Sequence, residues 1–137
     1  YQMLREVSID ENRVHFLGRL PYDKFLNVLQ ISSAHVYLTV PFVLSWSMLE
    51  AMAVGCLVIG SDTPPVREVI EHEKNGLLVD FFSPTSIADA VDLALNKPLS
   101  MKKMREAAQK YINKHYPIEK SIVQYKNLLE NLTGNTI

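Results

Sequence analysis

The sequence predicts an α/β fold, a Rossmann-like parallel sheet with helices on both faces. Two short runs, VYLTV at 36–40 and LVI at 57–59, are apolar or β-branched on successive residues rather than alternating, which is typical of strands covered on both faces. Between them, the apolar residues within 48–53 have helical spacing, and Gly55 is expected to end the helix. A strand, a helix and a strand within so few residues indicate a βαβ unit, in which the two strands are parallel.

The composition limits the classes of function. The chain has 137 residues, of which 47% are hydrophobic, and this suits one globular domain. A formal net charge of −1 argues against a general nucleic-acid or membrane-surface role, because both need a marked basic excess. The single cysteine, Cys56, excludes a disulfide framework, and its place before an apolar strand favours a buried structural thiol over a nucleophile. We expect a cytoplasmic protein.

The elements before the central unit are a strand and a helix. Residues 1–8 look like the tail of an element already under way, so we expect the chain to be a piece of a longer protein. Residues 14–17 predict a strand closed by Gly18, and a short helix begins at Pro21 or Tyr22. The apolar face of that helix consists of Phe25, Leu26 and Leu29.

The elements after the central unit continue the alternation of helix and strand. Thr63 is expected to cap a helix that has Pro64 at its first position and stops at Gly76. Residues 77–79 predict a fourth strand, and Ser83 is expected to cap the next helix. A further helix runs from Ser100 to about His115.

The last predicted helix begins at Pro117 and carries a long apolar stripe. This stripe consists of Ile118, Ile122, Tyr125, Leu129 and Leu132. It is longer than one small sheet needs as cover, so we expect part of it to be exposed or docked on a neighbour. The tail at 133–137 is expected to be disordered.

The loop at 41–47 is where function is expected. It joins the carboxyl end of a strand to the start of a helix, which is where parallel sheets bind ligands. Free backbone N–H groups and the positive end of the helix dipole suit a phosphate there, and Ser45 and Ser47 add hydroxyls. This pattern alone leaves two interpretations open, a phosphate or nucleotide site and a plain structural turn.

Two side chains next to this loop each have a structural and a functional interpretation. Ser47 and Glu50 have capping-box spacing, in which the glutamate bonds back to the N-cap amide. Alternatively, the Glu50 carboxylate accepts hydrogen bonds from the paired hydroxyls of a ribose. Trp46, the only tryptophan, either packs in the core, which is favoured, or stacks on a ring. The four histidines are scattered without ligand spacing, so no metal site is expected.

Four pieces of the sequence match, in order, the motifs of one enzyme family. They are RVHFLGR at 13–19, SAHVYLTVPF at 33–42, LEAMAVGCLV at 49–58, and PPVREVI at 64–70 together with NGLLV at 75–79. The chain therefore resembles the C-terminal, donor-binding domain of a retaining GT-B glycosyltransferase of family 4, the "group 1" glycosyltransferases. The first piece resembles the strand and glycine turn beside the nucleotide base, which implies Arg19 and Leu20 as substrate contacts.

The resemblance also implies the substrates and the division of the chain. The other implied donor contacts are Leu44, Ser45, Trp46, Ser47 and Glu50. Sugar transfer from a nucleotide-diphosphate sugar to a glycan or glycolipid acceptor is expected, with surface polysaccharide synthesis as the setting and no cofactor or metal. Residues 1–116 would be a partial nucleotide-sugar-binding domain and 117–132 a crossover helix. The full-length protein would be cytoplasmic or peripheral at the inner membrane face.

The sequence departs from the family pattern at important positions. The family usually has a glutamate eight residues before Glu50, but Phe42 stands there and Val43 does not replace it, so no catalytic residue is assigned. His35 stands where an aspartate is usual. The family's first two strands of this domain, and its whole N-terminal domain, would precede Tyr1. We therefore expect four parallel strands with an exposed edge, self-association, and no activity from this piece alone.

Two other functions remain as alternatives. One is a non-catalytic nucleotide- or sugar-binding module that kept the fold after losing the first glutamate. The other is an unrelated flavodoxin-like or receiver-like domain, although the sequence lacks an acidic phospho-acceptor cluster at its strand ends.

Overall fold

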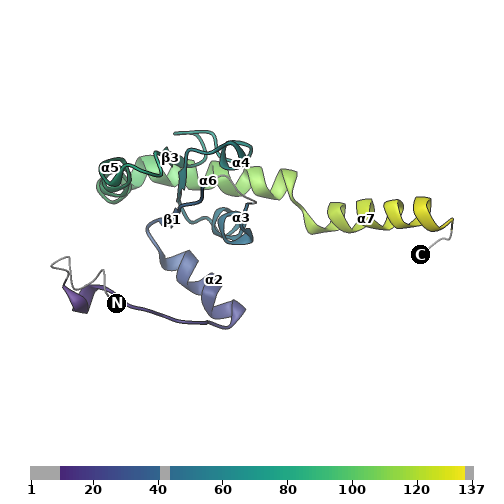
Figure 1. Ribbon diagram of the computed structural model, residues 1–137, viewed down its shortest axis with the longest axis horizontal. Coiled ribbons are helices and arrows are strands. Elements are labelled where there is room, and N and C mark those ends of the chain that lie inside the picture. Colours follow the sequence, from purple (N-terminus) through teal and green to yellow (C-terminus); the bar gives the residue numbers. More distant parts are fainter. Residues whose placement is uncertain (1–9, 41–43, 135–137) are drawn as a thin grey trace.

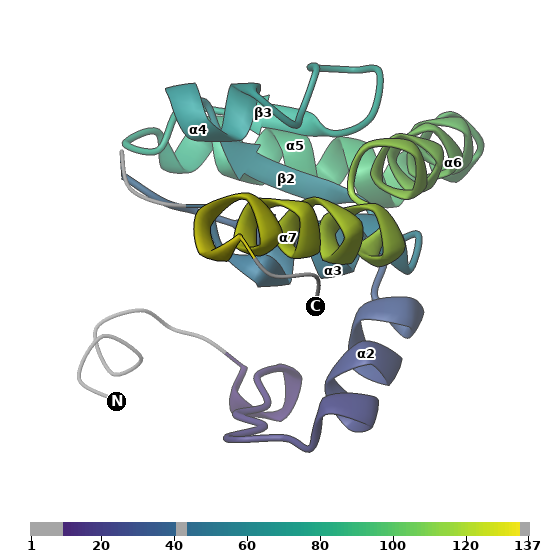
Figure 2. The same cartoon turned by 90° about the vertical axis from the view of Figure 1, so that its right-hand side faces the viewer.

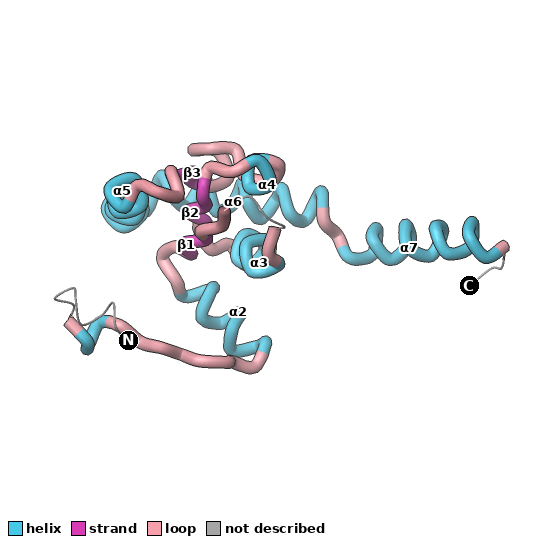
Figure 3. The backbone as a smooth tube through the Cα atoms, in the orientation of Figure 1, coloured by secondary structure: helices cyan, strands magenta, loops and turns pink. Residues whose placement is uncertain are grey.

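The computed structural model describes residues 10–40 and 44–134 and is built around a small parallel sheet. The strands are β1 (His35–Tyr37), β2 (Val58–Ser61) and β3 (Leu77–Val79), paired in the order β1-β2-β3 (Figures 1 and 3). His35 pairs with Val58 and Ile59 with Leu77, both in parallel register. The predicted α/β class with a parallel sheet is confirmed.

The helices surround this sheet. In chain order they are the 3-10 helix η1 (Glu11–Arg13), α2 (Tyr22–Ile31), α3 (Trp46–Ala53), α4 (Pro64–Arg67), α5 (Pro84–Asn96), α6 (Pro98–His115) and α7 (Ile118–Thr133). The Ser83 side chain caps α5 by accepting a hydrogen bond from the Ser86 N–H. Thr63 holds the N-cap position of α4, as predicted, but its hydroxyl makes no capping hydrogen bond within the described residues.

Both faces of the sheet are covered, because successive residues of the second apolar run enter different core clusters. Val58 packs in the cluster formed with α2, α3 and the second half of α6. Leu57 and Ile59 pack in the cluster formed with α5 and the first half of α6. Figure 3 shows α3 and α5 on opposite sides of β2, and Figure 2 gives the view at 90° to it. The predicted helices on both faces are therefore confirmed.

Cys56 is a buried structural thiol, as predicted. Only 1% of the residue is exposed, and it packs in the cluster formed with α2 and α3. This burial raises the pKa of the Cys56 thiol, although the nearby Arg105 guanidinium opposes the shift. The sulfur is therefore protonated and not poised as a nucleophile.

The strand predicted at 14–17 is wrong. The segment forms no strand, because none of the described strands lies beside it to share backbone hydrogen bonds. Phe16 and Leu17 are 67% and 54% exposed, and Figure 1 shows this part of the chain running away from the sheet. The sheet accordingly has three described strands rather than the predicted four.

Helix α6 begins at Pro98 rather than Ser100, and the C-terminal ends of two other helices also differ from the prediction. Helix α4 ends at Arg67 instead of continuing to Gly76. A loop follows it, and the Asn75 side chain holds this loop by accepting from the Glu71 N–H (2.7 Å) and donating to the Val69 carbonyl (2.9 Å). At the C-terminal end, Thr133 still belongs to α7 and is not part of a disordered tail. Residues 135–137 lie outside the described residues.

Helix α7 leaves its predicted apolar stripe open. The five side chains of the stripe are between 45% and 75% exposed, and the helix extends away from the rest of the molecule (Figure 1). The expected exposure of this stripe is confirmed. None of the helices in the described ranges has the length and apolar character that crossing a membrane requires.

The strand order leaves β1 at one edge of the sheet. Its outer side pairs with no strand among the described residues, and Val36 is 41% exposed. The expected exposed edge is thus present. Self-association through it stays a prediction.

Candidate functional site

The connection from β1 to α3 is held by two side chains from the sheet. The buried Ser61 hydroxyl donates to the Thr39 carbonyl (2.7 Å) and accepts from the Thr39 N–H (2.9 Å). The Tyr37 hydroxyl accepts from the Ser45 N–H (2.9 Å). The chain is thus fixed on both sides of residues 41–43, which lie outside the described residues and include Phe42 and Val43.

Ser45, rather than Ser47, is the N-cap of α3. The Ser45 hydroxyl oxygen accepts from the Ser47 N–H at 3.3 Å and lies 3.0 Å from the Ser47 hydroxyl. The third residue of the helix is therefore the buried Met48, and Glu50 is the fifth. The capping-box interpretation of Glu50 is wrong, because the box requires the glutamate at the third helical position.

The first turn of α3 offers a limited number of free amides. The Ser45 N–H donates to the Tyr37 hydroxyl, and the Ser47 N–H donates to the Ser45 hydroxyl. The Met48 N–H donates to the Ser45 carbonyl (3.2 Å). The Trp46 N–H has no hydrogen-bond partner in the part of the chain that the structure describes. This amide, the two serine hydroxyls and the helix dipole are what α3 presents to an anion.

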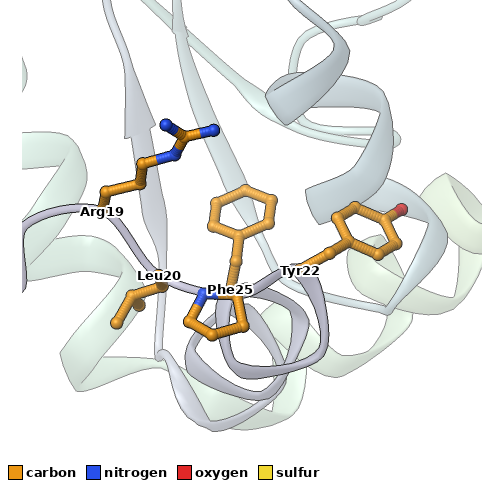
Figure 4. Close-up of a pocket in the computed structure, with 5 residues that line it drawn as sticks. Arg19, Leu20, Tyr22 and Phe25 are labelled. Carbon is orange, nitrogen blue, oxygen red and sulfur yellow. The ribbon is translucent and has the colours of Figure 1, made fainter.

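A hollow of about 570 Å³ lies at the start of α2. It is lined by Arg19, Leu20, Pro21, Tyr22 and Phe25. Figure 4 shows the Arg19 and Phe25 side chains extending to the same side of the chain, with the Tyr22 ring pointing away from them. The two residues predicted to contact a nucleotide base, Arg19 and Leu20, therefore share one hollow.

A second hollow, of about 670 Å³, lies between α3, the end of α6 and the start of α7. Its wall includes Trp46 and Glu50 from α3, together with Tyr22 and Tyr116. Trp46 is 79% exposed, so the favoured interpretation of it as a core residue is wrong. Helix α3 instead buries the face that carries Met48, and Trp46 remains accessible for stacking.

Tyr22 connects the two hollows, because it lines both of them. Tyr22 and Glu50 line the same second hollow, and the Glu50 carboxylate raises the pKa of the Tyr22 hydroxyl. The predicted contacts Arg19 and Leu20 thus line one hollow and Glu50 the other, and Tyr22 lines both. Leu44 lies apart from these hollows, since it packs against the core cluster under α3.

Three residues of this region were missed by the sequence analysis. They are Tyr22, which lines the second hollow with Glu50, and Tyr37 and Ser61, which hold the connection between β1 and α3. No local pattern marks them, because each acts through a contact between segments that are distant in sequence.

Two further groups of titratable side chains lie near the sheet. The Nε2 atom of His35 is buried without a partner among the described residues, and burial lowers the pKa of this histidine. Asp62 directly follows β2, and Arg67 of α4 donates two hydrogen bonds to its carboxylate, one of them at 2.7 Å. This ion pair lowers the pKa of Asp62. The described residues include no group of three metal-binding side chains.

Comparison with known proteins places the chain in a family. The model of the family described as "Glycosyl transferases group 1" matches residues 9–111. The chain belongs to the group 1 glycosyl transferases. The match includes α3 and both hollow-lining residues that were predicted to contact the base, Arg19 and Leu20.

Two similar proteins illustrate the extent of the match. The chain is 30% identical over 128 residues to the N-acetyl-alpha-D-glucosaminyl L-malate synthase of Bacillus anthracis, covering 93% of this chain and 32% of the relative. Its fold matches Anabaena HepE, solved in complex with UDP-glucose, with a TM-score of 0.88 at 19% identity, over 95% of this chain and 35% of the other.

A third match is to a single domain. The C-terminal domain of the group 1 protein LpcC from Francisella tularensis gives a TM-score of 0.74 at 23% identity, over 85% of this chain and 60% of that one. The predicted Rossmann-like fold is confirmed by these structures. The chain spans about a third of the length of the curated relatives it matches.

Proposed function

We propose that this chain is the donor-binding part of a glycosyltransferase that transfers a sugar from a nucleotide-diphosphate sugar. The observation that carries the proposal is the position of Glu50, a partly exposed residue of α3 that lines a hollow whose wall shares Tyr22 with the hollow of Arg19. The membership in the group 1 family supports the reaction class, and the fold shared with UDP-glucose-bound HepE supports the type of donor.

The proposal assigns a role to each predicted contact. The nucleotide base lies in the hollow of Arg19 and Leu20, and the ribose hydroxyls donate hydrogen bonds to the Glu50 carboxylate. The diphosphate lies at the N-terminus of α3, where the Trp46 amide, the serine hydroxyls and the helix dipole meet its charge. Because Ser45 caps α3, the Glu50 carboxylate is not needed as a cap, and beside its contact with Tyr22 it keeps acceptor positions for the ligand.

Catalysis in this proposal comes from positioning the donor and stabilising the leaving diphosphate. The family resemblance supports retention of the anomeric configuration, a hexosyl donor, and a glycan or glycolipid acceptor in surface polysaccharide assembly at the cytoplasmic face of a membrane. The proposal includes no cofactor, and the nucleotide sugar is the donor substrate. Residues 1–116 form the donor part and 117–132 the helix that crosses to a second domain, a role supported by the exposed stripe of α7.

Calorimetric titration of the intact protein with UDP, GDP and ADP tests the proposal. The wild type should bind at least one diphosphate, and Glu50→Ala should weaken that binding by about 1.5–3 kcal/mol, the usual range for hydrogen bonds to a charged group. Because Glu50 does not cap the helix, the melting temperature of this variant should stay close to that of the wild type. Glu106→Ala, on the exposed face of α6, is the matched control and should change neither quantity.

Two outcomes would contradict parts of the proposal. A wild type that binds none of the three diphosphates would refute the donor-binding role. Binding of a diphosphate without turnover of the corresponding nucleotide sugar would favour the non-catalytic module instead, which Phe42 in place of the family glutamate supports. In that case Phe42→Glu should restore turnover.

A further inference from the structure

Among the described residues that line the two hollows, Tyr22 is the one that lines both. It is the first residue of α2 and directly follows Pro21, whose ψ of 150° is extended rather than helical. The change in direction turns the Tyr22 ring away from Arg19 and Leu20 (Figure 4). The ring is tilted by 34° against that of Phe25, with centroids 6.5 Å apart. Tyr22 is 62% exposed and lines the hollow beside α3 together with Glu50.

The core fixes the distance between Tyr22 and Glu50. Leu29 of α2 is 3% exposed and packs in the same core cluster as Met48 and Met52 of α3. The two helices therefore keep one relative position, and Tyr22 and Glu50 line the same hollow. The carboxylate raises the pKa of Tyr22, so the phenol keeps its proton at neutral pH and is the donor in this contact.

We propose that Tyr22 is a positioning residue that holds the Glu50 carboxylate in the orientation that receives the ribose hydroxyls. This inference rests on the proposed donor-binding function. A carboxylate has about four acceptor positions, so one hydrogen bond from the phenol leaves room for two sugar hydroxyls. A carboxylate that is already oriented loses less side-chain freedom when the nucleotide binds, which increases affinity.

The same contact links recognition of the base with recognition of the ribose. The wall of the first hollow includes Tyr22, so a base bound against Arg19 lies next to the residue that orients Glu50. Removing the hydroxyl should therefore affect the ribose contact in particular, while the shape of the base hollow is kept by the remaining ring.

The test compares Tyr22→Phe with the wild type in the intact protein. The probes are UDP, GDP and ADP and their 2′-deoxy counterparts, titrated by calorimetry. Tyr22→Phe should bind the preferred diphosphate about two- to tenfold more weakly, the effect of one hydrogen bond of ordinary net strength. It should also reduce the preference for ribose over deoxyribose, and it should have no effect when Glu50→Ala is already present. Tyr125→Phe on α7 is the matched control and should change nothing.

The outcomes separate this inference from the function on which it rests. If Glu50→Ala weakens binding but Tyr22→Phe changes neither the affinity nor the ribose preference, the positioning role is overturned and the function stands. An equal loss from Tyr22→Phe with and without Glu50 also overturns it, because the hydroxyl then acts independently of the carboxylate. If the wild type binds no diphosphate, the proposed function fails and the inference fails with it.

Discussion

Replacing Ser61 by alanine should loosen the connection between β1 and α3. The Ser61 hydroxyl is fully buried and makes two hydrogen bonds to the backbone of Thr39, at 2.7 and 2.9 Å. Each such bond contributes about 0.5–1.5 kcal/mol net, so removing both would cost about 1–3 kcal/mol. Because Thr39 is only half-buried, water can partly replace the hydroxyl. We therefore expect a loss of about 1–2 kcal/mol in the free energy of unfolding.

Urea denaturation followed by circular dichroism measures this loss. The midpoint should fall without a change in the slope, since the surface exposed on unfolding is the same. Ser121→Ala is the matched control, because its hydroxyl lies on exposed α7 and bonds only to the Pro117 carbonyl of its own turn. If Ser61→Ala were as stable as Ser121→Ala, the claim that Ser61 holds the connection between β1 and α3 would be refuted.

Three other changes have defined outcomes. Burial lowers the pKa of His35 in the folded state, so the unfolded wild type binds more protons below about pH 6.5 and the wild type loses stability there. His35→Asn should remove this loss. Equal pH profiles of the melting temperature for the two proteins would contradict the expectation. Gly76→Ala should cost about 1–3 kcal/mol by denaturation. Its added Cβ would lie 2.9 Å from Ile70 and 3.2 Å from the Val58 carbonyl, and unchanged stability would disprove this close packing. Ile122→Ser in α7 should leave the melting temperature of this chain unchanged, since the side chain is exposed, and a clear decrease would show that the stripe is packed.

The central sheet could be predicted from the sequence because its strands carry their own signal. Leu57, Val58 and Ile59 are apolar in succession, and the structure places them alternately in two core clusters. The segment at 14–17 has a similar composition but forms no strand, since a strand also needs a neighbour that supplies hydrogen bonds. The composition of a segment indicates whether its side chains prefer to be buried. It does not show whether a neighbouring strand is present to pair with the backbone.

The location of the candidate site was predictable, but its local geometry was not. The rule that ligands bind at the carboxyl end of a parallel strand identified the start of α3. Both Ser45 and Ser47 satisfy the sequence rules for an N-cap, and the choice of Ser45 coincides with its contact to the Tyr37 hydroxyl. The exposure of Trp46 and the contact of Tyr22 with Glu50 depend on how α2, α3 and α6 pack, which no local pattern shows.

The most direct measurement of the central claim is a crystal structure of the intact protein with its preferred nucleoside diphosphate. The account predicts the ribose hydroxyls within hydrogen-bonding distance of the Glu50 carboxylate, the base in the hollow of Arg19 and Leu20, and the diphosphate at the N-terminus of α3. A diphosphate bound away from α3, or a ribose that leaves Glu50 in solvent, would contradict it.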